Sequence, residues 1–219
     1  ACDLHPDYLS TQYAEVLAKE LKIPLFRIQH HHAHIASCMA ESGLDEELIG
    51  ISLDGTGYGP DGNSWGGEFM IADLKRFQRI SHFDYVPMPG GAKAINDPWR
   101  MAFSYLYKYF GDDFDYLSVP LFRSIGPDKL GKVREMIVKK MNSPLTSGAG
   151  RLFDAVSALL GLCSSETFDA EAPMRLESAI TRRTDELYPF TISESVSFYE
   201  TFKAILEDIA VLTGADPIF

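Results

Sequence analysis

The segment from residue 30 to residue 34 is rich in imidazole, because four of its five residues are histidine, and it follows a short apolar run. If the segment is helical, His30 and His34 lie one above the other on the same face, since residues four apart on a helix are neighbours. Two imidazoles placed in this way suit a divalent metal ion. In the same geometry His31 and His32 point elsewhere. The alternative is an exposed polar helix start, but four histidines after a predicted strand favour the metal site.

A carboxylate at the end of an apolar run is the second candidate. Residues 51–53 lead into Asp54, which opens a glycine-rich segment that extends to residue 62. Glycine lets the backbone approach a ligand closely and leaves N–H groups for phosphate oxygens, while Asp54 could complete the histidine metal site. A hairpin turn is the alternative, because Asp-Gly is common in such turns. The candidate phosphate-binding residues are Gly55, Thr56, Gly57 and Gly59.

A loop of small residues at 147–150 precedes an apolar helical pattern. The N-terminus of such a helix, at Gly150, can face an anion because its first N–H groups have no partner within the helix. Asp154, one turn into the helix, could accept hydrogen bonds from ribose hydroxyls. Alternatively, Asp154 only complements the helix dipole, and the spacing alone favours this second interpretation.

The segment from residue 88 to residue 102 combines a flexible Pro-Gly loop with Trp99 and Arg100 at a predicted helix start. Arg100 could hold a phosphate or carboxylate through two hydrogen bonds, and Trp99 could shield it, which makes Arg100 the catalytic candidate. An equally good interpretation buries Trp99 in the core and gives Arg100 a surface ion pair.

The elements around these candidates predict an α/β protein. A helix is expected where apolar residues recur three and four apart, then a short strand, and then a helix that contains the histidines and ends at Gly43. Three strand-like runs follow as an antiparallel meander, and the pattern becomes helical from Asp97 onwards. The expected strands are residues 23–28, 48–53, 67–72 and 79–86, and the other expected helices are 12–21, 99–110, 127–141, 150–162 and 196–212. The Pro-Gly-rich stretch 87–94 is the candidate hinge.

Composition narrows the classes of function. The net charge of −11 opposes the phosphate backbone of nucleic acids, so no nucleic-acid partner is expected. No run of 18 apolar residues and no signal peptide are evident, which predicts a cytoplasmic protein without a membrane partner. Three widely spaced cysteines do not predict a disulfide framework, and Cys38 and Cys163 are expected to be buried apolar residues.

Six short motifs, taken together and in this order, resemble the HypF family of hydrogenase maturation carbamoyltransferases. The motifs start at Asp3, Gln29, Asp54, Trp65, Pro98 and Gly150, and read DLHPDYLST, QHHHAH, DGTGYGPDG, WGGEF, PWRMA and GRLFDA. The resemblance covers residues 1 to about 178 and fades over the acidic C-terminal third.

The resemblance implies a fold, a domain organisation and a metal site. The fold would be an actin-like ASKHA (RNase H-like) domain related to the TsaD-type transferases, incomplete in this chain. Residues 1–46 would end a first lobe, and residues 47–219 would begin a second. His30, His34 and Asp54 would bind a divalent metal ion, zinc or iron, together with an aspartate from a later motif that this chain lacks.

The resemblance also implies a reaction. The donor would be carbamoyl-adenylate, made from carbamoyl phosphate and ATP by a YrdC-like domain that this chain lacks. The carbamoyl group would pass to the C-terminal cysteine of HypE, for the cyanide ligand of [NiFe]-hydrogenase. In this picture the loop from Asp54 to Gly59 holds phosphate, Asp154 holds the ribose, and the metal ion acts as a Lewis acid.

The sequence departs from the family pattern at three positions. Ala92 stands where aspartate is usual and Asn96 where arginine is usual, which affects the Pro-Gly loop. Ala170 stands where the family favours glycine, and it would be strained if the backbone there adopts a positive φ. Three other functions remain open: an antibiotic-type O-carbamoyltransferase, a TsaD-like role on tRNA, and an inert nucleotide- or partner-binding module in which the histidines are structural.

Overall fold

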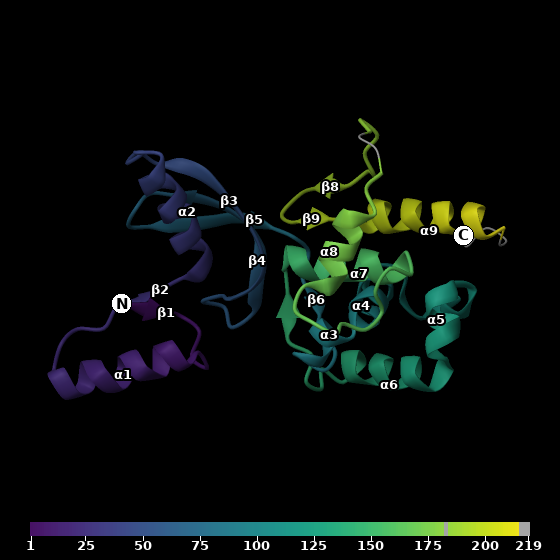
Figure 1. The fold of residues 1–219 in the computed structure, drawn as a ribbon, viewed down its shortest axis with the longest axis horizontal. Coiled ribbons are helices and arrows are strands. Elements are labelled where there is room, and N and C mark those ends of the chain that lie inside the picture. Colours follow the sequence, from purple (N-terminus) through teal and green to yellow (C-terminus); the bar gives the residue numbers. More distant parts are fainter. Residues whose placement is uncertain (182–183, 215–219) are drawn as a thin grey trace.

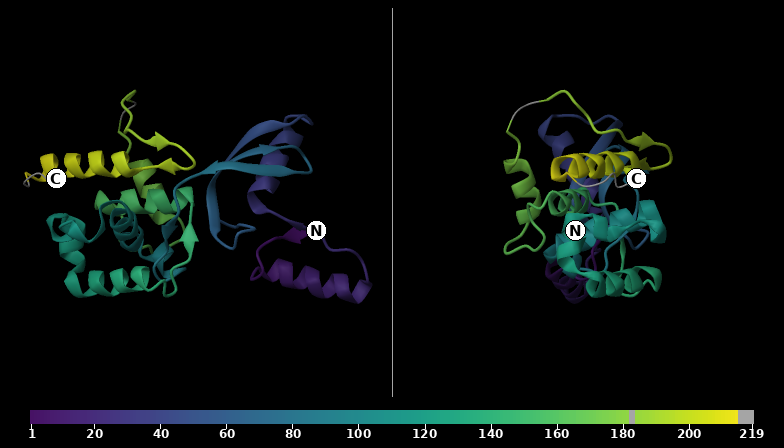
Figure 2. Two further views of the ribbon diagram at one scale, coloured as in Figure 1. Left: turned by 180° about the vertical axis from the view of Figure 1, so that it is seen from behind. Right: turned by 90° about the vertical axis from the view of Figure 1, so that its right-hand side faces the viewer.

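A computed structural model describes residues 1–181 and 184–214, which form an α/β protein with two parts (Figure 1). The N-terminal part contains the long strands and two helices, and the C-terminal part is mainly helical. Figure 2 shows that α1 and the C-terminal end of α9 lie at opposite ends of the molecule. No helix among the described residues is long and apolar enough to span a membrane.

The N-terminal part is built on an antiparallel meander that α2 covers on one face (Figure 1). A separate parallel pair, β1 with β2, places residues Cys2–Asp3 beside Arg27–Ile28. The elements of this part are β1 (Cys2–Asp3), α1 (Leu9–Leu21), β2 (Arg27–Ile28), α2 (His30–Glu41), β3 (Leu48–Tyr58), β4 (Ser64–Ala72) and β5 (Phe77–His82).

The C-terminal part joins the sheet through β7, which pairs with the start of β4 and with β6. Its elements are β6 (Val86–Pro87), α3 (Lys93–Asn96), α4 (Pro98–Phe110), the 3-10 turns η1 (Gly111–Asp113) and η2 (Tyr116–Ser118), α5 (Pro120–Ile125), α6 (Pro127–Val138), β7 (Leu145–Thr146), α7 (Ala149–Leu159), α8 (Glu171–Ser178), β8 (Thr191–Ile192), β9 (Val196–Ser197) and α9 (Tyr199–Thr213).

Two apolar cores hold these parts together. The larger core lies among α4, α7 and α9, where Phe103, Tyr105 and Phe202 are fully buried. The smaller core lies between α2 and the meander and contains Ile35 and Met70. Because α2 packs on β3 and β4, residues on both sides of the expected lobe boundary at 46 and 47 share this smaller core. The last five residues of the expected second lobe lie outside the described residues.

Most expected elements are present, with boundaries that local chemistry explains. The strand expected at 23–28 shortens to Arg27–Ile28, since Pro24 has no N–H for a ladder. The helix expected at 127–141 ends at Val138, because Lys140 and Asn142 adopt left-handed backbone conformations. The helix expected at 150–162 ends at Leu159, shortly before the positive φ of Gly161.

The expected strand 79–86 and the expected helix 196–212 need larger corrections. The strand expected at 79–86 is two strands, β5 and β6, since the N–H of Asp84 between them donates to the carbonyl of Val196 instead. The helix expected at 196–212 starts at Tyr199, because Val196 and Ser197 form β9 with β8. The predicted hinge, 87–94, contains a turn between β6 and α3, and the N–H groups of Met88 and Gly90 donate to the carbonyls of Pro144 and Asn142.

The three cysteines are free thiols, as expected. Cys163 is buried, which confirms that part of the prediction. The prediction was wrong for Cys38, which lies on α2 and is exposed.

Candidate functional site

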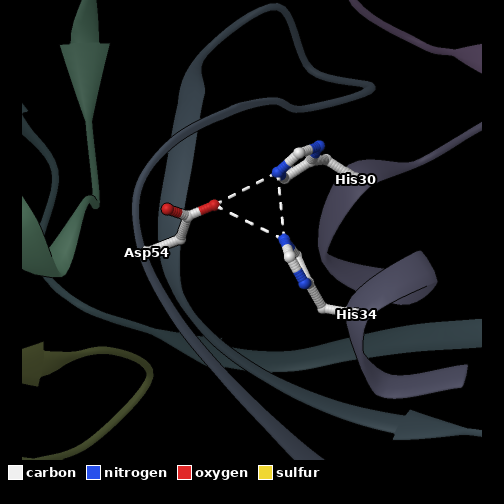
Figure 3. Close-up of side chains that lie close together, drawn as sticks. All are labelled: His30, His34 and Asp54. Carbon is white, nitrogen blue, oxygen red and sulfur yellow. Dashed lines mark hydrogen bonds and ion pairs between the residues drawn. The ribbon is translucent and has the colours of Figure 1, made fainter. Parts of the chain in front are cut away.

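Three predicted metal ligands converge between helix α2 and strand β3 (Figure 3). The Nε2 atoms of His30 and His34 are 3.1 Å apart. Oδ2 of Asp54 lies 3.2 Å from Nε2 of His30 and 3.8 Å from Nε2 of His34. The structure therefore brings together the three side chains that the sequence singled out for a metal ion.

The start of α2 places the histidine pair. Gln29 caps the helix, since its side-chain oxygen accepts a hydrogen bond from the N–H of His32 at 2.9 Å. The helix consequently begins at His30, and His34 follows one turn later on the same face. Asp54 comes from β3, which is longer than expected and reaches Tyr58, with an irregularity in its pairing between Leu53 and Gly57.

The donor set fits a divalent cation. In a tetrahedral site with metal–ligand distances near 2.0–2.1 Å, neighbouring ligand atoms lie about 3.3 Å apart, close to the separations among His30, His34 and Asp54. Nδ1 of His30 lies 2.8 Å from a carboxylate oxygen of Asp3, which can only accept, so Nδ1 carries a proton. With Nδ1 as the donor to Asp3, a lone pair on Nε2 would face the Asp54 carboxylate, an arrangement that a cation between them would stabilise. Two imidazoles and one carboxylate suit zinc and iron alike.

The two middle histidines have different surroundings. His32 points away from the site, as expected, and its Nε2 donates to the carbonyl oxygen of Asp73 at 2.8 Å. His31 is not one of the three converging ligands, as expected, although its Nε2 lies 3.9 Å from Oδ2 of Asp54. His31 is fully buried, and burial lowers the pKa of its imidazole to about 4. His31 is therefore a neutral ring that closes the inner side of the site.

The glycines of the predicted phosphate loop allow elements to pack closely. A Cβ on Gly57 would lie 2.4 Å from Cε1 of His31, and one on Gly59 would lie 2.1 Å from Nε1 of Trp65. A Cβ on Gly150 would lie 2.8 Å from Cα of Gly55, so the start of α7 rests on the backbone next to Asp54. These three contacts give a packing reason for glycine, and phosphate binding by the loop stays a prediction.

Thr56, the remaining loop candidate, has its hydroxyl 3.0 Å from that of Ser64. The hydroxyl is thus tied across the hairpin that joins β3 and β4, where Gly59 and Asn63 also share a backbone hydrogen bond. The hairpin that the sequence left open as an alternative is present between these strands.

Asp154 is fully buried in α7, and neither of its carboxylate oxygens has a hydrogen-bond partner. Nε of Arg151 lies 2.9 Å from Oδ2 of Asp154, a close ion pair without hydrogen-bond alignment. Burial raises the pKa of Asp154 to about 7, and the charge of Arg151 opposes that rise. The buried carboxylate is not accessible to a ribose in the described conformation, and the ribose contact stays a prediction.

Arg100, the predicted catalytic residue, lies apart from the three metal ligands. Its guanidinium pairs with Asp97, with Nε 3.1 Å from Oδ2, and Nη1 donates to the carbonyl of Pro89 at 3.3 Å. Trp99 beside it belongs to the larger core. This arrangement matches the ion-pair interpretation of Arg100, and its catalytic role stays a prediction.

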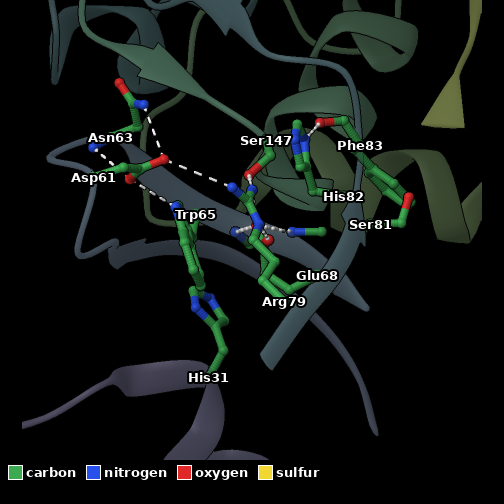
Figure 4. A network of polar contacts seen from close by, with 12 residues as sticks. His31, Asp61, Asn63, Trp65, Glu68, Arg79, Ser81, His82, Phe83 and Ser147 are labelled. Atoms are coloured by element: carbon green, nitrogen blue, oxygen red, sulfur yellow. Dashed lines mark hydrogen bonds and ion pairs between the residues drawn. The ribbon is translucent and has the colours of Figure 1, made fainter. Parts of the chain in front are cut away.

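The sequence did not single out a buried ion pair behind the site (Figure 4). Glu68 on β4 is fully buried and pairs with Arg79 on β5. Its carboxylate also accepts hydrogen bonds from the N–H groups of Gly66 and Gly67 and from the hydroxyl of Ser147 at 2.6 Å. A carboxylate in the middle of an otherwise apolar strand was the signal that could have identified it.

Arg79 also links this ion pair to the histidine helix (Figure 4). Its guanidinium lies 4.0 Å from the ring centroid of Trp65. The indole Nε1 of Trp65 donates to Asp61 at 2.9 Å, and its ring stacks on His31. The side chains behind the metal ligands thus form one continuous network from β5 to α2.

A groove of about 450 Å³ runs between α2 and β3 and reaches the metal ligands. His34 and Asp54 lie at its end, and the exposed thiol of Cys38 lies on its wall. Along β3 the side chains of Ile49 and Ile51 are more than half exposed. The site is therefore accessible from one side, whereas His31 and Trp65 close the other.

Comparisons with known proteins identify the family models and relatives that this chain matches. Residues 50–217 match the family model described as "Carbamoyltransferase, Kae1-like Domain, second subdomain", and residues 1–41 match the one described as "HypF Kae1-like domain". A probable carbamoyltransferase HypF from Methanocaldococcus jannaschii is 40% identical over 182 residues, which cover 83% of this chain and 24% of the relative. Carbamoyltransferase HypF2 from Cupriavidus necator is 41% identical over 177 residues, which cover 81% of this chain and 21% of the relative.

Two solved structures have the same fold. A crystal structure of full-length HypF in the phosphate- and nucleotide-bound form superposes with a TM-score of 0.84 at 37% identity, covering 99% of this chain and 28% of that one. A crystal structure of HypF from T. kodakarensis gives a TM-score of 0.82 at 36% identity, covering 99% of this chain and 29% of that one. The chain thus spans about a quarter of the length of each of these four proteins.

Proposed function

Because the chain belongs to the HypF carbamoyltransferase family, we propose that it is the metal-binding part of a carbamoyltransferase that acts in hydrogenase maturation. One observation carries this proposal. His30, His34 and Asp54 direct three ligand atoms at one point, within 3.8 Å of one another. The predicted α/β ASKHA fold class agrees with the structural match to HypF.

Some residues around this point hold the candidate metal ligands, and others shield the site from water. His30 and His34 are fixed by the capped first turns of α2, and Asp54 is fixed by β3. The buried ring of His31 and the indole of Trp65 exclude water from the inner side. The groove beside His34 and Asp54 admits substrate from the outer side. A bound divalent cation would supply Lewis-acid stabilisation of the charge that develops on the carbamoyl oxygen.

The proposed donor is carbamoyl-adenylate, and the proposed acceptor is the C-terminal cysteine thiolate of HypE. The sulfur attacks the carbamoyl carbon, a C–S bond forms, and the C–O bond to the phosphate breaks, so that AMP leaves with the electron pair. The thiol proton passes to solvent before the attack. The partner supplies the nucleophile, and this chain supplies the site that holds the carbamoyl group.

Family membership supports this choice of donor and acceptor, and the metal ligands support the class of chemistry. An inert binding module would need no convergence of three ligand atoms in an accessible groove. An antibiotic-type O-carbamoyltransferase would use the same metal chemistry, so the metal ligands do not distinguish it from a HypF enzyme. The HypF family models favour the HypF function, because they match both halves of this chain.

A segment exchange tests the proposal. In a hybrid protein, the part of this chain that aligns with the Methanocaldococcus relative replaces the corresponding 24% of that relative. The hybrid is given carbamoyl phosphate, ATP and a peptide with the C-terminal sequence of HypE, and the peptide is weighed by mass spectrometry. We expect one carbamoyl group on the cysteine, and none with a hybrid that carries His30→Ala and His34→Ala. A folded hybrid without transfer, or undiminished transfer by the double variant, would contradict the proposal.

A further inference from the structure

Asp3, near the N-terminus, contacts the metal ligand His30 from the side opposite the other ligands. One carboxylate oxygen, Oδ2, lies 2.8 Å from Nδ1 of His30. The Nε2 atom at the other end of the same imidazole faces His34 and Asp54. Only 18% of the Asp3 side chain is exposed, so the contact is largely shielded from water.

The backbone of Asp3 is fixed by its neighbours. Asp3 lies opposite Ile28 in the parallel pair of β1 with β2, and Gln29 and His30 follow directly in the chain. The fully buried Thr11 donates its hydroxyl to the carbonyl of Asp3 at 3.2 Å. The short parallel pair therefore sets the position of Asp3 relative to the first turn of α2.

The carboxylate itself is also held in one orientation. Its other oxygen, Oδ1, accepts a hydrogen bond from the N–H of His5 at 2.8 Å. Since the carboxylate has no proton to donate, its bond with Nδ1 of His30 requires that Nδ1 carry the hydrogen. The imidazole then keeps Nε2 as the atom that offers a lone pair.

We propose that Asp3 is a positioning residue of the metal site, which holds the His30 ring with Nδ1 protonated and Nε2 directed at the cation. This inference rests on the proposed function, because it presumes that His30, His34 and Asp54 bind a metal ion. Carboxylates placed behind a ligating imidazole fix its tautomer and orientation and make it a stronger ligand. His34 has no carboxylate at its Nδ1 among the described residues, so Asp3 makes His30 the better prepared of the two ligands.

The two histidines would therefore have different roles in metal binding. His30, 27% exposed and held from behind, is in place before a cation arrives. His34, 59% exposed, has a ring that is free to adjust as the cation binds. Removing the support of Asp3 should thus weaken metal binding without removing a ligand.

The first experiment measures the zinc affinity of the 219-residue chain by competition with a chromogenic chelator. Asp3→Ala should lower the affinity by about 10- to 100-fold, and Asp3→Asn, which keeps an oxygen near Nδ1 but no charge, should have a smaller effect. Asp7→Asn, a change of an exposed aspartate in the same segment, is the matched control and should leave the affinity unchanged. Unfolding of the metal-free variants in urea separates lost folding from lost positioning.

The second experiment needs no metal and reads the tautomer of His30 directly by nitrogen NMR of the metal-free chain. We expect a proton on Nδ1 of His30 in the wild type, and its partial loss in Asp3→Asn. Wild-type zinc affinity in folded Asp3→Ala, or a His30 ring protonated only at Nε2, would overturn the inference. Failure of the wild-type chain to bind zinc would instead count against the metal site, and the NMR measurement would still decide the role of Asp3.

Discussion

Nε2 of His30 lies 3.2 Å from Oδ2 of Asp54, although the first residue opens helix α2 and the second lies on strand β3. Close packing of the two elements creates this contact. Gly57 contributes to the packing, because its missing side chain leaves room for the rings of α2 above the strand. The proposed metal site thus depends on the fit between α2 and β3 as well as on the identity of its three candidate ligands.

Gly57→Ala should disturb this fit. The added Cβ would meet the ring of His31 at 2.4 Å and Cβ of His30 at 3.2 Å, so α2 must move outward. We expect a loss of stability of about 1–3 kcal/mol from overpacking, together with weaker zinc binding. Urea unfolding and a zinc titration measure the two effects.

Gly131→Ala is the control for this substitution. Gly131 lies inside α6, and nothing is within 4 Å of the position that a Cβ would take. Alanine there should stabilise the chain by about 0.5–1 kcal/mol and leave zinc binding unchanged. Equal effects of the two substitutions would show that Gly57 has no packing role at the site.

Arg79→Met should be strongly destabilising. It leaves the buried carboxylate of Glu68 without its opposite charge, although the hydroxyl of Ser147 and two backbone N–H groups still donate to it. Breaking a buried ion pair in this way costs about 3–5 kcal/mol. Chemical denaturation of the metal-free chain measures the loss.

The exposed ion pair between Arg76 and Asp73 is the control for the buried pair between Arg79 and Glu68. Their closest side-chain atoms are 3.5 Å apart, and the side chain of Arg76 is 86% exposed. Arg76→Met should change the free energy of unfolding by less than about 1 kcal/mol. A loss at Arg79 as small as this one would mean that the buried pair does not stabilise the sheet.

The sequence predicted the convergence of His30, His34 and Asp54, because the signal for these three residues is local. Residues four apart on a helix must share a face, and a carboxylate at the end of an apolar strand is visible without a structure. The partners of the supporting side chains were not predictable in the same way. Asp3 and Glu68 act through contacts with residues far away in the chain, and nothing in their own surroundings in the sequence names those partners.

In the fold as well, elements with a local sequence signal were predictable, and elements that depend on distant partners were not. Long helices such as α4 and long strands such as β4 follow from apolar periodicity, whereas two-residue strands such as β9 depend on tertiary pairing. The expectation for the glycine segment was wrong in extent, because β3 continues through Gly55 and Gly57 to Tyr58. Glycine lowers strand propensity, but pairing with β4 overrides that preference.

Ala170→Gly should stabilise the chain. Ala170 has a φ of 61° directly before α8, which confirms the positive φ for which the sequence predicted strain at this position. Relief of that strain outweighs the greater freedom of glycine in the unfolded chain, so we expect a gain of about 0.5–1 kcal/mol. Thermal or urea unfolding checks the sign.

Ala179→Gly is the matched control, because Ala179 at the other end of α8 has a φ of −77° and no strain to relieve. Glycine there should lower stability slightly, through the entropy of the unfolded chain. Equal changes at both positions would argue against strain at Ala170.

The stability of the chain should carry a pH dependence from Asp154. Its pKa is about 7 in the folded protein, raised by burial, against 3.8 for an ordinary aspartate. Between these values the folded state holds a proton that the unfolded chain has released, so this carboxyl lowers stability as pH rises from about 4 to 7. Asp154→Asn should remove that decline, and the variant should gain on the wild type by up to about 1.4 kcal/mol per pH unit in this range.

Urea unfolding of both proteins at a series of pH values measures the difference. His31, whose pKa burial lowers to about 4, contributes a slope of opposite sign, but it is present in both proteins and cancels in the comparison. A constant difference between the two proteins from pH 4 to pH 8 would show that Asp154 is ionised throughout.

A zinc titration of the metal-free chain tests the central claim most directly. We expect the wild type to bind one zinc ion, and His30→Ala, His34→Ala and Asp54→Ala each to lower the affinity by more than about 100-fold. His82→Ala, which removes an imidazole outside the site, should leave the affinity unchanged. Wild-type affinity in a variant that lacks all three ligands would contradict the account.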